Sequence, residues 1–528
     1  MITNYFNRYF LFISVVLITS CKSAETKLEN QKPNILFIMS DDHTSQAWGI
    51  YGGVLKDYVQ TPNITRLADE GMVLNNAFCT NSICVPSRAS ILTGQYSNKN
   101  GVYTLSDALD PNRPNIAKLL NNSGYQTAII GKWHLKKEPS GFDYYNILHN
   151  QGRYWDPILK TADNFHKPAK EWNVHEGFST DVITDLSLKW LDTIDRSKPF
   201  MLMTHFKATH EPFDYPERYN DLYKDIEIPE PESLFDFSSE TTGRSFKGQK
   251  LEELARRYGK ASDDPDKWWC KYPGLPFYTA DMDSVTARKA VYQKFIKDFM
   301  RSGAAIDDNI GRILDYLEEN GLAENTVVIY TADQGYFLGE HGFFDKRMIY
   351  DESLRMPFVI RYPKEIEAGK RLDDIIMNID FSALFADYAG VKVPESIQGK
   401  SFRQNLMGKT PSDWRKAAYY RYWTNHPVRP SHFGIRNKRF KLALFYGQSL
   451  DMTGSSKEST VPAWEFFDLE KDPKENHNAY NDVEYIDIIK EMKSEMQKLR
   501  SEYGDTDSQY PKMQEIFEQS WDYTKVKE

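Results

Sequence analysis

Four short apolar runs in the chain are each followed by polar residues with chemically active side chains. The runs cover residues 35–39, 127–130, 200–203 and 327–330. Continuous apolar runs of this length are typical of strands that are buried on both faces of a sheet. Helical patterns alternate with them, at residues 64–71, 116–124, 180–194 and 288–319. This alternation predicts an α/β fold with a largely parallel central sheet flanked by helices.

The residues that follow these runs carry carboxylate, amide, lysine and histidine side chains. They are Asp41, Asp42, Lys132, His134, His210, Asp333 and Gln334. Because sites in such sheets form at the carboxyl ends of the strands, we expect these side chains to meet in one pocket. The carboxylate and amide oxygens among them are hard ligands, which favour Ca²⁺ or Mg²⁺ over zinc. His205, in the same region, is interpreted as a packed residue.

Two stretches interrupt this alternation. Residues 144–172 are rich in aromatic and polar side chains, and residues 221–282 are charged and contain prolines without clear periodicity. Both are interpreted as long surface insertions, which commonly carry substrate loops. Within the first, Tyr154 and Trp155 are candidate platforms for a sugar ring, with ordinary packing as the alternative.

The pattern changes after about residue 405. Segments at residues 417–423, 433–435, 440–445 and 464–469 look like short antiparallel strands separated by turns. A helical pattern follows, with one apolar face made of Ile488, Met492, Met496 and Leu499. We therefore predict a catalytic domain over residues 33–405 and a small C-terminal α+β subdomain with an antiparallel sheet over residues 406–528.

Residues 1–20 look like an export signal. Arg8 precedes an apolar run at residues 9–18 that is too short to span a bilayer as a mature helix. The signal ends Ile18-Thr19-Ser20-Cys21, which resembles a bacterial lipobox, so Cys21 is the predicted lipidation site and residues 21–32 the tether. The prediction is an exported bacterial lipoprotein, in the periplasm or on the outer-membrane surface, that meets the membrane through its lipid only. A simple cleaved signal with an incidental cysteine is the alternative.

One short motif is the strongest chemical signal in the chain. It reads Cys84-Val85-Pro86-Ser87-Arg88 and continues directly into Ala89-Ser90-Ile91-Leu92-Thr93-Gly94. Pro86 suits the first turn of a helix and Gly94 its end. Residue 84 is then expected at a helix N-terminus, where free N–H groups and the helix dipole favour an anion such as sulfate. Arg88 lies one turn further on the same face. A buried cysteine at an ordinary helix start is the alternative.

The string CVPSRASILTG resembles the signature of the type I sulfatases of the alkaline phosphatase superfamily. The resemblance runs from Pro33 to about Leu469 and extends through the closing segment FDLEKDP at residues 467–473. It implies an alkaline-phosphatase-like fold and an aldehyde, formylglycine, made from Cys84 by a formylglycine-generating enzyme. It also implies a calcium ion with the modified residue 84 and four further ligands, Asp41, Asp42, Asp333 and Gln334. The last of these positions varies among members of the family.

The same resemblance assigns the catalytic residues. Arg88 would hold the modified residue 84, and Lys132 and His134 match the K-x-H pair of the family. His210 matches its H-x-P histidine, and Lys346 its sulfate-binding lysine. In the implied mechanism the cations neutralise the sulfuryl oxygens while one hydroxyl of the hydrated aldehyde attacks sulfur, with Asp333 as the base that takes its proton. The alcohol leaves with a proton from His210 or Lys346, and the second hydroxyl, deprotonated by His134, expels sulfate.

Three further residues are weaker candidates for contact with the sulfate or the substrate. His341, in Gly339-Glu340-His341-Gly342, is a candidate sulfate contact or a residue that holds its loop. His432 and Arg436 are candidate substrate contacts from the C-terminal subdomain, with a structural role as the alternative.

Composition adds two limits. The formal net charge of −9 argues against a generic nucleic-acid binder, so no nucleic acid is expected as a partner. The chain has four cysteines, and if Cys21 and Cys84 are modified, only Cys79 and Cys270 remain to pair. Nothing in the sequence indicates that they do.

The leading interpretation is a sulfatase that acts on a sulfated oligo- or polysaccharide. Ulvan, carrageenan and glycosaminoglycans are the substrates that an exported bacterial member of the family suggests. Segments at residues 141–148 and 151–154 resemble bacterial sulfatases that are linked to 6-sulfated N-acetylglucosamine or to marine polysaccharides. A phosphodiesterase or phosphonate monoester hydrolase on the same scaffold is one alternative. A catalytically dead, glycan-binding surface protein is the other.

Overall fold

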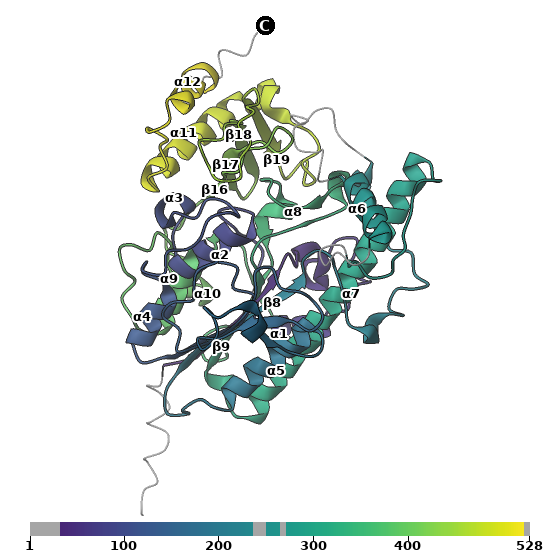
Figure 1. Cartoon of the computed structure of the whole chain (residues 1–528). Helices are drawn as coiled ribbons and strands as arrows, with labels where there is room; N and C mark the ends of the chain where they lie inside the picture. The colour runs from purple at the N-terminus through teal and green to yellow at the C-terminus, as the bar shows by residue number, and fades with distance from the viewer. Residues whose placement is uncertain (1–31, 236–249, 265–270, 522–528) are drawn as a thin grey trace, which may run out of the picture. The chain divides into compact units, whose positions relative to one another are not determined.

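A ten-stranded sheet forms the centre of the protein in the computed structural model, which describes residues 32–235, 250–264 and 271–521. Helices lie on both of its faces (Figure 1). The strands follow the order β14 (Lys370–Leu372), β2 (Met72–Leu74), β13 (Phe358–Arg361), β9 (Thr326–Ala332), β1 (Asn34–Asp41), β8 (Phe200–Thr209), β4 (Gln126–Gly131), β5 (Tyr144–Leu148), β6 (Ile158–Lys160) and β7 (Asn173–Val174).

Four neighbouring strands of this sheet are the ones that the apolar runs predict. β9, β1, β8 and β4 lie side by side, and each neighbouring pair among them is parallel. β5 continues the parallel part beyond β4, whereas β13, β6 and β7 pair antiparallel nearer the two edges. Because the four parallel strands end at the same edge, the polar residues that follow them converge there. The predicted α/β class with a largely parallel sheet is confirmed.

Alternate residues of β1 pack into separate cores on the two faces of the sheet. Ile35, Phe37 and Met39 belong to one core and Leu36 and Ile38 to the other, and all are fully buried. Burial on both faces explains why these strands read as continuous apolar runs. The first core includes side chains of α2 (Cys84–Thr93), α4 (Ile116–Asn122) and α9 (Asp380–Tyr388), and the second those of α1 (Pro62–Asp69), α5 (Ser179–Leu191) and α7 (Ser284–Glu319).

The C-terminal part carries its own four-stranded antiparallel sheet. Its strands are β16 (Ala417–Tyr422), β17 (His432–Asn437), β18 (Phe440–Phe445) and β19 (Ala463–Asp468), followed by α11 (Ile486–Glu502) and α12 (Pro511–Ser520) (Figure 1). The buried face of α11 contains Ile489, Met492, Met496 and Leu499, so Ile489 takes the place that the pattern gave to Ile488. The predicted α+β character of this region is confirmed. The described residues from Pro33 onward form one compact unit by their contacts, and the boundary at residue 405 stays a prediction.

The two predicted insertions contain more regular structure than their sequences indicate. The first begins with β5, a strand of the main sheet, because Tyr145, Ile147 and Leu148 are buried there. The second contains the 13-residue helix α6 (Leu251–Asp263), which buries Leu251, Leu254, Tyr258 and Ala261. That spacing is helical, so the interpretation of a stretch without periodicity was wrong for this part.

The export signal, Cys21 and most of the tether lie outside the described residues, as does Cys270. Within the described part of the chain, no helix is long and apolar enough to cross a membrane. Cys79 and Cys84 are buried free thiols.

Candidate active site

Cys84 is the first residue of α2, at the sheet edge where the four parallel strands end. The residue before it, Ile83, is extended, and Gly94 ends the helix in the left-handed conformation with φ of 66°. Pro86 lies in the first turn, as predicted, and all ten residues of the helix are buried. Burial raises the pKa of the Cys84 thiol, so an unmodified thiol here is neutral at pH 7 and a weak nucleophile.

Carboxylates from two strands surround this cysteine. Asp41 Oδ1 lies 3.4 Å from Cys84 Sγ, and the backbone N–H of Asp42 donates to Asp333 Oδ1 at 3.2 Å. Ligand atoms of these three aspartates lie within 4.8 Å of one another, and the side chains are fully buried. The structure therefore brings together the acidic residues that the strand ends predict.

Three cations pair with these carboxylates. Arg88 Nε lies 2.9 Å from Asp333 Oδ2, and Lys346 Nζ lies 2.6 Å from Asp42 Oδ1. Lys132 Nζ donates to Asp41 Oδ2. Each cation thus has a carboxylate partner, and the three positive charges lie around the start of α2.

Two residues of the site have strained backbones. Asp42 has φ of 68° and His134 has φ of 57°, both in the left-handed region that residues other than glycine rarely adopt. Both follow directly or closely on a strand, where the chain turns sharply at the sheet edge. Such strain is common at functional sites, where the surrounding structure fixes a costly conformation.

Burial controls the ionisation of the carboxylates. It raises the pKa of Asp42 to about 6 and that of Asp333 to about 7, against the opposing effects of Lys346 and Arg88. Burial also disfavours the charged form of Asp41, but Lys132, His210 and Arg88 outweigh it and hold that pKa well below its usual value. The carboxylates of Asp42 and Asp333 are therefore under-neutralised, which an additional cation would relieve.

The donor set fits a hard divalent cation. Gln334 Nε2 donates to Asp42 Oδ1 at 2.5 Å and also lies 3.8 Å from Cys84 Sγ. Its other amide atom, Oε1, is buried and has no hydrogen-bond partner in the described part of the chain. An unpartnered buried amide oxygen beside three clustered carboxylates is the kind of oxygen site that Ca²⁺ or Mg²⁺ prefers.

The two predicted histidines flank this cluster. His210 Nε2 lies 3.9 Å from Asp42 Oδ2, and its Nδ1 lies 2.8 Å from the carbonyl oxygen of Glu211. Because that oxygen only accepts, Nδ1 carries the proton and Nε2 faces the cluster. Burial lowers the pKa of His210 and of His134 well below the usual value, so both rings are neutral at pH 7.

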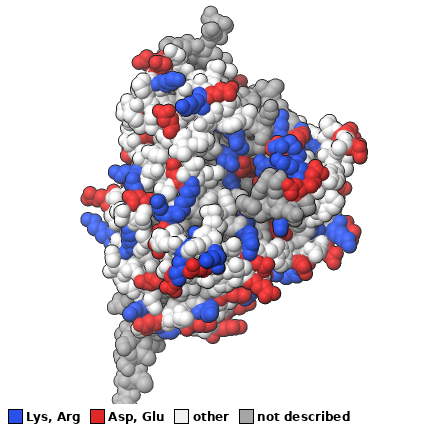
Figure 2. All heavy atoms as spheres, in the orientation of Figure 1, with Lys and Arg blue, Asp and Glu red and all other residues white. Residues whose placement is uncertain are grey.

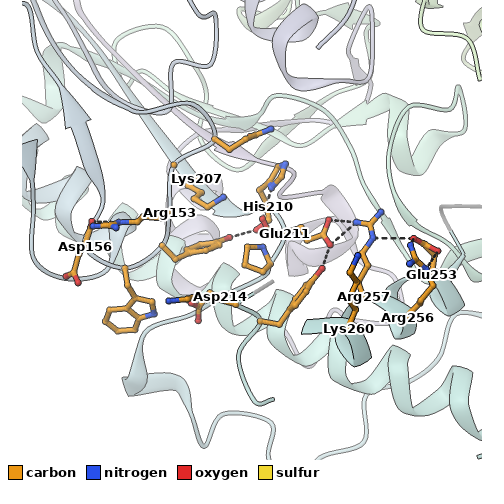
Figure 3. A pocket seen from close by; sticks show the side chains of 17 residues that line it. Arg153, Asp156, Lys207, His210, Glu211, Asp214, Glu253, Arg256, Arg257 and Lys260 are labelled. Atoms are coloured by element: carbon orange, nitrogen blue, oxygen red, sulfur yellow. Dashed lines mark hydrogen bonds and ion pairs between the residues drawn. The ribbon is translucent and has the colours of Figure 1, made fainter. Parts of the chain in front are cut away.

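A cavity of about 580 Å³ adjoins the cluster at His210. Both insertions line it, the first through residues 151–156 and the second through α6 and residues 271–272. Figure 3 shows the labelled Arg153 and Arg256 toward opposite ends, with Lys207 and His210 between them. Tyr154 and Trp155, the predicted sugar platforms, are in its wall. Trp155 is 39% exposed, whereas Tyr154 is buried and donates to the His210 carbonyl oxygen at 2.6 Å.

The weaker candidates do not lie in the lining of this cavity. His341 is buried and packs beside Phe343 and Tyr350, which fits the alternative of a loop-holding residue. His432 is fully buried, with its ring stacked on Phe445. Arg436 is 4% exposed and binds Asp351, with Nη2 2.9 Å from Oδ2, in α8 (Asp351–Leu354). Substrate contact by His432 and Arg436 is not supported, because packing and a long-range ion pair hold them in the interior.

Two residues near the site were missed by the sequence reasoning. Gln151 Oε1 accepts a hydrogen bond from Lys132 Nζ at 2.7 Å, which joins the first insertion to the cluster. Lys207 lies in β8 and in the cavity wall. The signal for Lys207 was a lysine between Phe206 and Ala208 in this strand, three residues before His210. No such signal in the sequence indicated Gln151. His205 is packed as predicted, with its ring 5.8 Å from that of Phe37.

Comparison with known proteins places the chain in a family. A family model described as Sulfatase matches residues 33–391, and one described as N-sulphoglucosamine sulphohydrolase, C-terminal, matches residues 339–502. An N-acetylglucosamine-6-O-sulfatase of Bacteroides thetaiotaomicron is 38% identical over 94% of this chain and 91% of its own length. An ulvan-active sulfatase of Formosa agariphila is 26% identical over 94% of this chain and 87% of its own.

A solved structure gives the same result for the fold. It is described as a complex with its substrate, D-glucosamine-2-N,6-O-disulfate, and is 36% identical to this chain. The TM-score is 0.82, with 91% of this chain and 100% of the other covered. The chain therefore belongs to the sulfatase family, enzymes of alkaline-phosphatase-like fold that hydrolyse sulfate esters.

Proposed function

We propose that this sulfatase removes a 6-O-sulfate group from a glucosamine-type sugar of a glycosaminoglycan. The relative with 38% identity over almost the whole chain carries this proposal, since its name specifies that sugar and that position. The described substrate of the similar solved structure is a 6-O-sulfated glucosamine as well. Ulvan is the second candidate, because an ulvan-active sulfatase is also a relative, at 26% identity.

The shape of the site supports a sugar substrate. The cavity next to His210 has a volume of about 580 Å³, within the usual range for pockets that bind small molecules. Trp155 offers an exposed aromatic face in its wall, and Asp214 offers a carboxylate. An aromatic face suits the apolar side of a sugar ring, and a carboxylate suits its hydroxyl groups.

Cys84 is proposed to carry the nucleophile as formylglycine, and Asp41, Asp42, Asp333 and Gln334 to hold a calcium ion. When present, the hydrated aldehyde supplies a nucleophilic oxygen and the cation polarises the sulfate group. The neutral thiol of unmodified Cys84 and the unpartnered Gln334 Oε1 support these two assignments.

Fixed positive charge around residue 84 supports stabilisation of the reacting sulfate. Arg88, Lys132 and Lys346 are buried and held in place by their carboxylates. Preorganised charges of this kind stabilise the charge that develops on the sulfuryl oxygens without having to reorient. Burial opposes the charge on Lys346, but Asp42 outweighs it and holds the pKa above its usual value.

His210 is the proposed proton donor to the departing sugar oxygen. Its Nδ1 is committed to the Glu211 carbonyl, and its ring is in the cavity wall, so Nε2 is free to exchange a proton with a substrate. A bound sulfate ester adds negative charge next to the ring and raises its pKa, which favours the protonated form. His134, whose buried Nδ1 has no hydrogen-bond partner in the described chain, is the proposed base for turnover.

A panel of defined sulfated substrates tests the proposal. We expect sulfate release from 6-O-sulfated N-acetylglucosamine to be at least about tenfold faster, in kcat/KM, than from 3-O-sulfated N-acetylglucosamine or from ulvan oligosaccharides. Mass spectrometry of residue 84 confirms that the aldehyde is present, because expression without the modifying enzyme leaves a thiol. Preferred turnover of ulvan oligosaccharides would contradict the glucosamine assignment.

The alternatives on the same scaffold are tested by the same preparation. An aryl phosphodiester should turn over more slowly than an aryl sulfate, and the reverse order would favour the phosphodiesterase or phosphonate hydrolase. A dead glycan-binding protein would bind the sugar and release no sulfate while carrying the aldehyde.

Calcium dependence is tested by chelation. Removing Ca²⁺ should abolish most of the activity and lower the Tm, since buried like charges are left uncompensated, and Ca²⁺ should restore both. An unchanged Tm and unchanged activity after chelation would contradict a calcium site.

Lipidation at Cys21 and export to the periplasm or the outer-membrane surface are part of the proposal. The lipobox-like end of the predicted signal supports it. A Cys21→Ser variant should move from the membrane fraction to the soluble fraction, and an unchanged distribution would contradict the anchor.

A further inference from the structure

Lys207 is a buried lysine that makes no ion pair with a carboxylate in the part of the chain that the structure describes. It is 3% exposed, and its Nζ lies 4.8 Å from the centroid of the Tyr154 ring. In the described chain its ammonium group makes no hydrogen bond or ion pair. The carboxylates of Asp41, Asp42 and Asp214 act on it through their charge without pairing with it. Burying an ammonium group with so little compensation is costly, which points to a partner that arrives from outside the protein.

The arginines on the other side of the cavity differ in this respect. Arg257 Nη1 lies 2.8 Å and 2.7 Å from the two carboxylate oxygens of Glu211. Arg256 Nε donates to Glu253 at 2.9 Å. These pairs are drawn in Figure 3, and Figure 2 shows the same mixture of Lys and Arg with Asp and Glu over the visible face. Protein carboxylates already neutralise these arginines.

The position of Lys207 separates it from the cations of the sulfate cluster. The cavity lining includes Lys207 and His210, but not Lys132, Lys346 or Arg88. His210 is the proposed proton donor to the sugar oxygen, so a group beside it in the cavity wall faces the sugar. Lys207 is thus placed to contact a substituent of the sugar, while the cluster behind His210 binds the sulfate that is removed.

A carboxylate that lines the cavity together with Lys207 is held by other partners. Asp214, the carboxylate in the same part of the wall, accepts from the backbone N–H of Tyr215 at 2.8 Å and is also hydrogen-bonded by Trp155. Burial, followed by the charge of Lys132, lowers the pKa of Lys207 to about 7. A bound anion favours the protonated ammonium and relieves this penalty.

We propose that Lys207 recognises a second anionic substituent of the substrate, in the cavity beside the sulfate that is hydrolysed. The group is a sulfate, sulfamate or carboxylate, carried by the same sugar or by its neighbour. This inference rests on the proposed function and adds to it a preference for more highly charged glycosaminoglycan units.

Three substrates and two variants test the inference. The substrates are 6-O-sulfated N-acetylglucosamine, 6-O-sulfated N-sulfoglucosamine, and a disaccharide of 6-O-sulfated N-acetylglucosamine with a uronic acid. The wild-type enzyme should prefer one of the two more charged substrates by about tenfold in kcat/KM, and which one it prefers identifies the source of the anion. Lys207→Met should abolish this preference, mainly through KM, while turnover of the first substrate stays within about twofold. Lys207→Arg, the matched control, should keep most of the preference.

Several outcomes would overturn the inference. The first is a wild-type enzyme that shows no preference for the more charged substrates. The second is a preference that survives in Lys207→Met, and the third is a loss of kcat/KM in Lys207→Met that is equal for all three substrates. As a second measurement, a Cys84→Ala variant with Lys207 intact should bind the preferred charged substrate about tenfold more tightly than the N-acetyl compound, and equal affinities would count against it. Activity without charge preference defeats this inference alone, whereas no sulfate release from any glucosamine substrate by aldehyde-bearing enzyme defeats the proposed function as well.

Discussion

At the sheet edge, each of the three cations pairs with a carboxylate, whereas Lys207 in the neighbouring cavity wall makes no ion pair with any described residue. The paired cluster comes from strand ends and from α2, and it surrounds the residue that is proposed to react. The cavity wall comes largely from the two insertions. This difference suggests a division of roles, in which the sheet edge acts on any sulfate ester and the cavity wall selects the sugar.

The largest effect is expected at Cys84. Cys84→Ser should lower multiple-turnover sulfate release by about 10⁴-fold or more, because serine offers a single hydroxyl and nothing then expels the sulfuryl group. The loss should be equal for glycan and aryl sulfates, as expected of the sheet-edge site. Intact mass should reveal a sulfuryl group retained on residue 84, and repeated turnover by this variant would contradict the mechanism.

A smaller loss is expected at Gln151, which connects the two regions. Gln151→Ala removes the 2.7 Å hydrogen bond from Lys132 Nζ and should lower kcat/KM by about tenfold, the usual effect of losing a hydrogen bond to a charged group. Because Gln151 acts through Lys132, the loss should be similar for an aryl sulfate and a sugar sulfate. A loss confined to sugar substrates would show that Gln151 acts on the sugar from the cavity wall and not through Lys132.

The charge preference itself should depend on pH. Lys207, with a pKa of about 7, is charged at lower pH and neutral at higher pH, so the ratio of kcat/KM for charged and neutral substrates should fall between about pH 6 and pH 8.5. The groups that act on Lys207 are Lys132, Asp41, Asp42, Cys84 and Asp214. Effects that these groups exert on the chemical step are the same for both substrates, so they cancel in the ratio of the two kcat/KM values. Lys207→Arg stays charged, so its ratio should not vary with pH, and a parallel fall in that variant would refute the assignment.

The smallest effect on activity is expected at Arg436. Arg436→Met breaks the buried ion pair with Asp351. Asp351 keeps two other ion pairs, one with Lys441 at 2.8 Å and one with Arg355 at 2.9 Å. We expect a loss of about 2 to 3 kcal/mol in the free energy of unfolding and an unchanged kcat/KM per folded molecule. Thermal unfolding and substrate kinetics measure the two. A change in substrate preference would instead show that Arg436 contacts the substrate.

Prediction from the sequence succeeded where local pattern and chemistry coincide. The sequence predicted β1, β4, β8 and β9 because strands that are buried on both faces are continuously apolar. It also predicted that the residues after these strands meet, because parallel strands end at the same edge of a sheet. Cys84 was identified through the resemblance of its motif to the sulfatase signature, and Pro86 and Gly94 predicted the helix that it begins. α6 was missed although Leu254 and Tyr258 have helical spacing, since its charged surface hid the pattern.

Arg436 and Lys207 show the opposite case. From the sequence alone, an arginine or a histidine near a predicted strand gives the same signal whether its side chain faces a substrate or the protein interior. Arg436 is held by Asp351, which lies 85 residues away, and nothing local indicates that partner. The position of Lys207 in a strand can be read from the sequence, but only the structure shows that its ammonium group makes no ion pair with a described carboxylate.

The sequence by itself determined the family, the α/β class and the residues at the sheet edge, because these depend on periodicity and on a short motif that act locally. The tertiary structure decided which charges are already neutralised and which face the cavity. Ion pairing and burial depend on contacts between distant segments, such as Arg257 with Glu211 and Lys207 with Tyr154. The free energy of a charged side chain is therefore set by neighbours that the order of residues does not reveal.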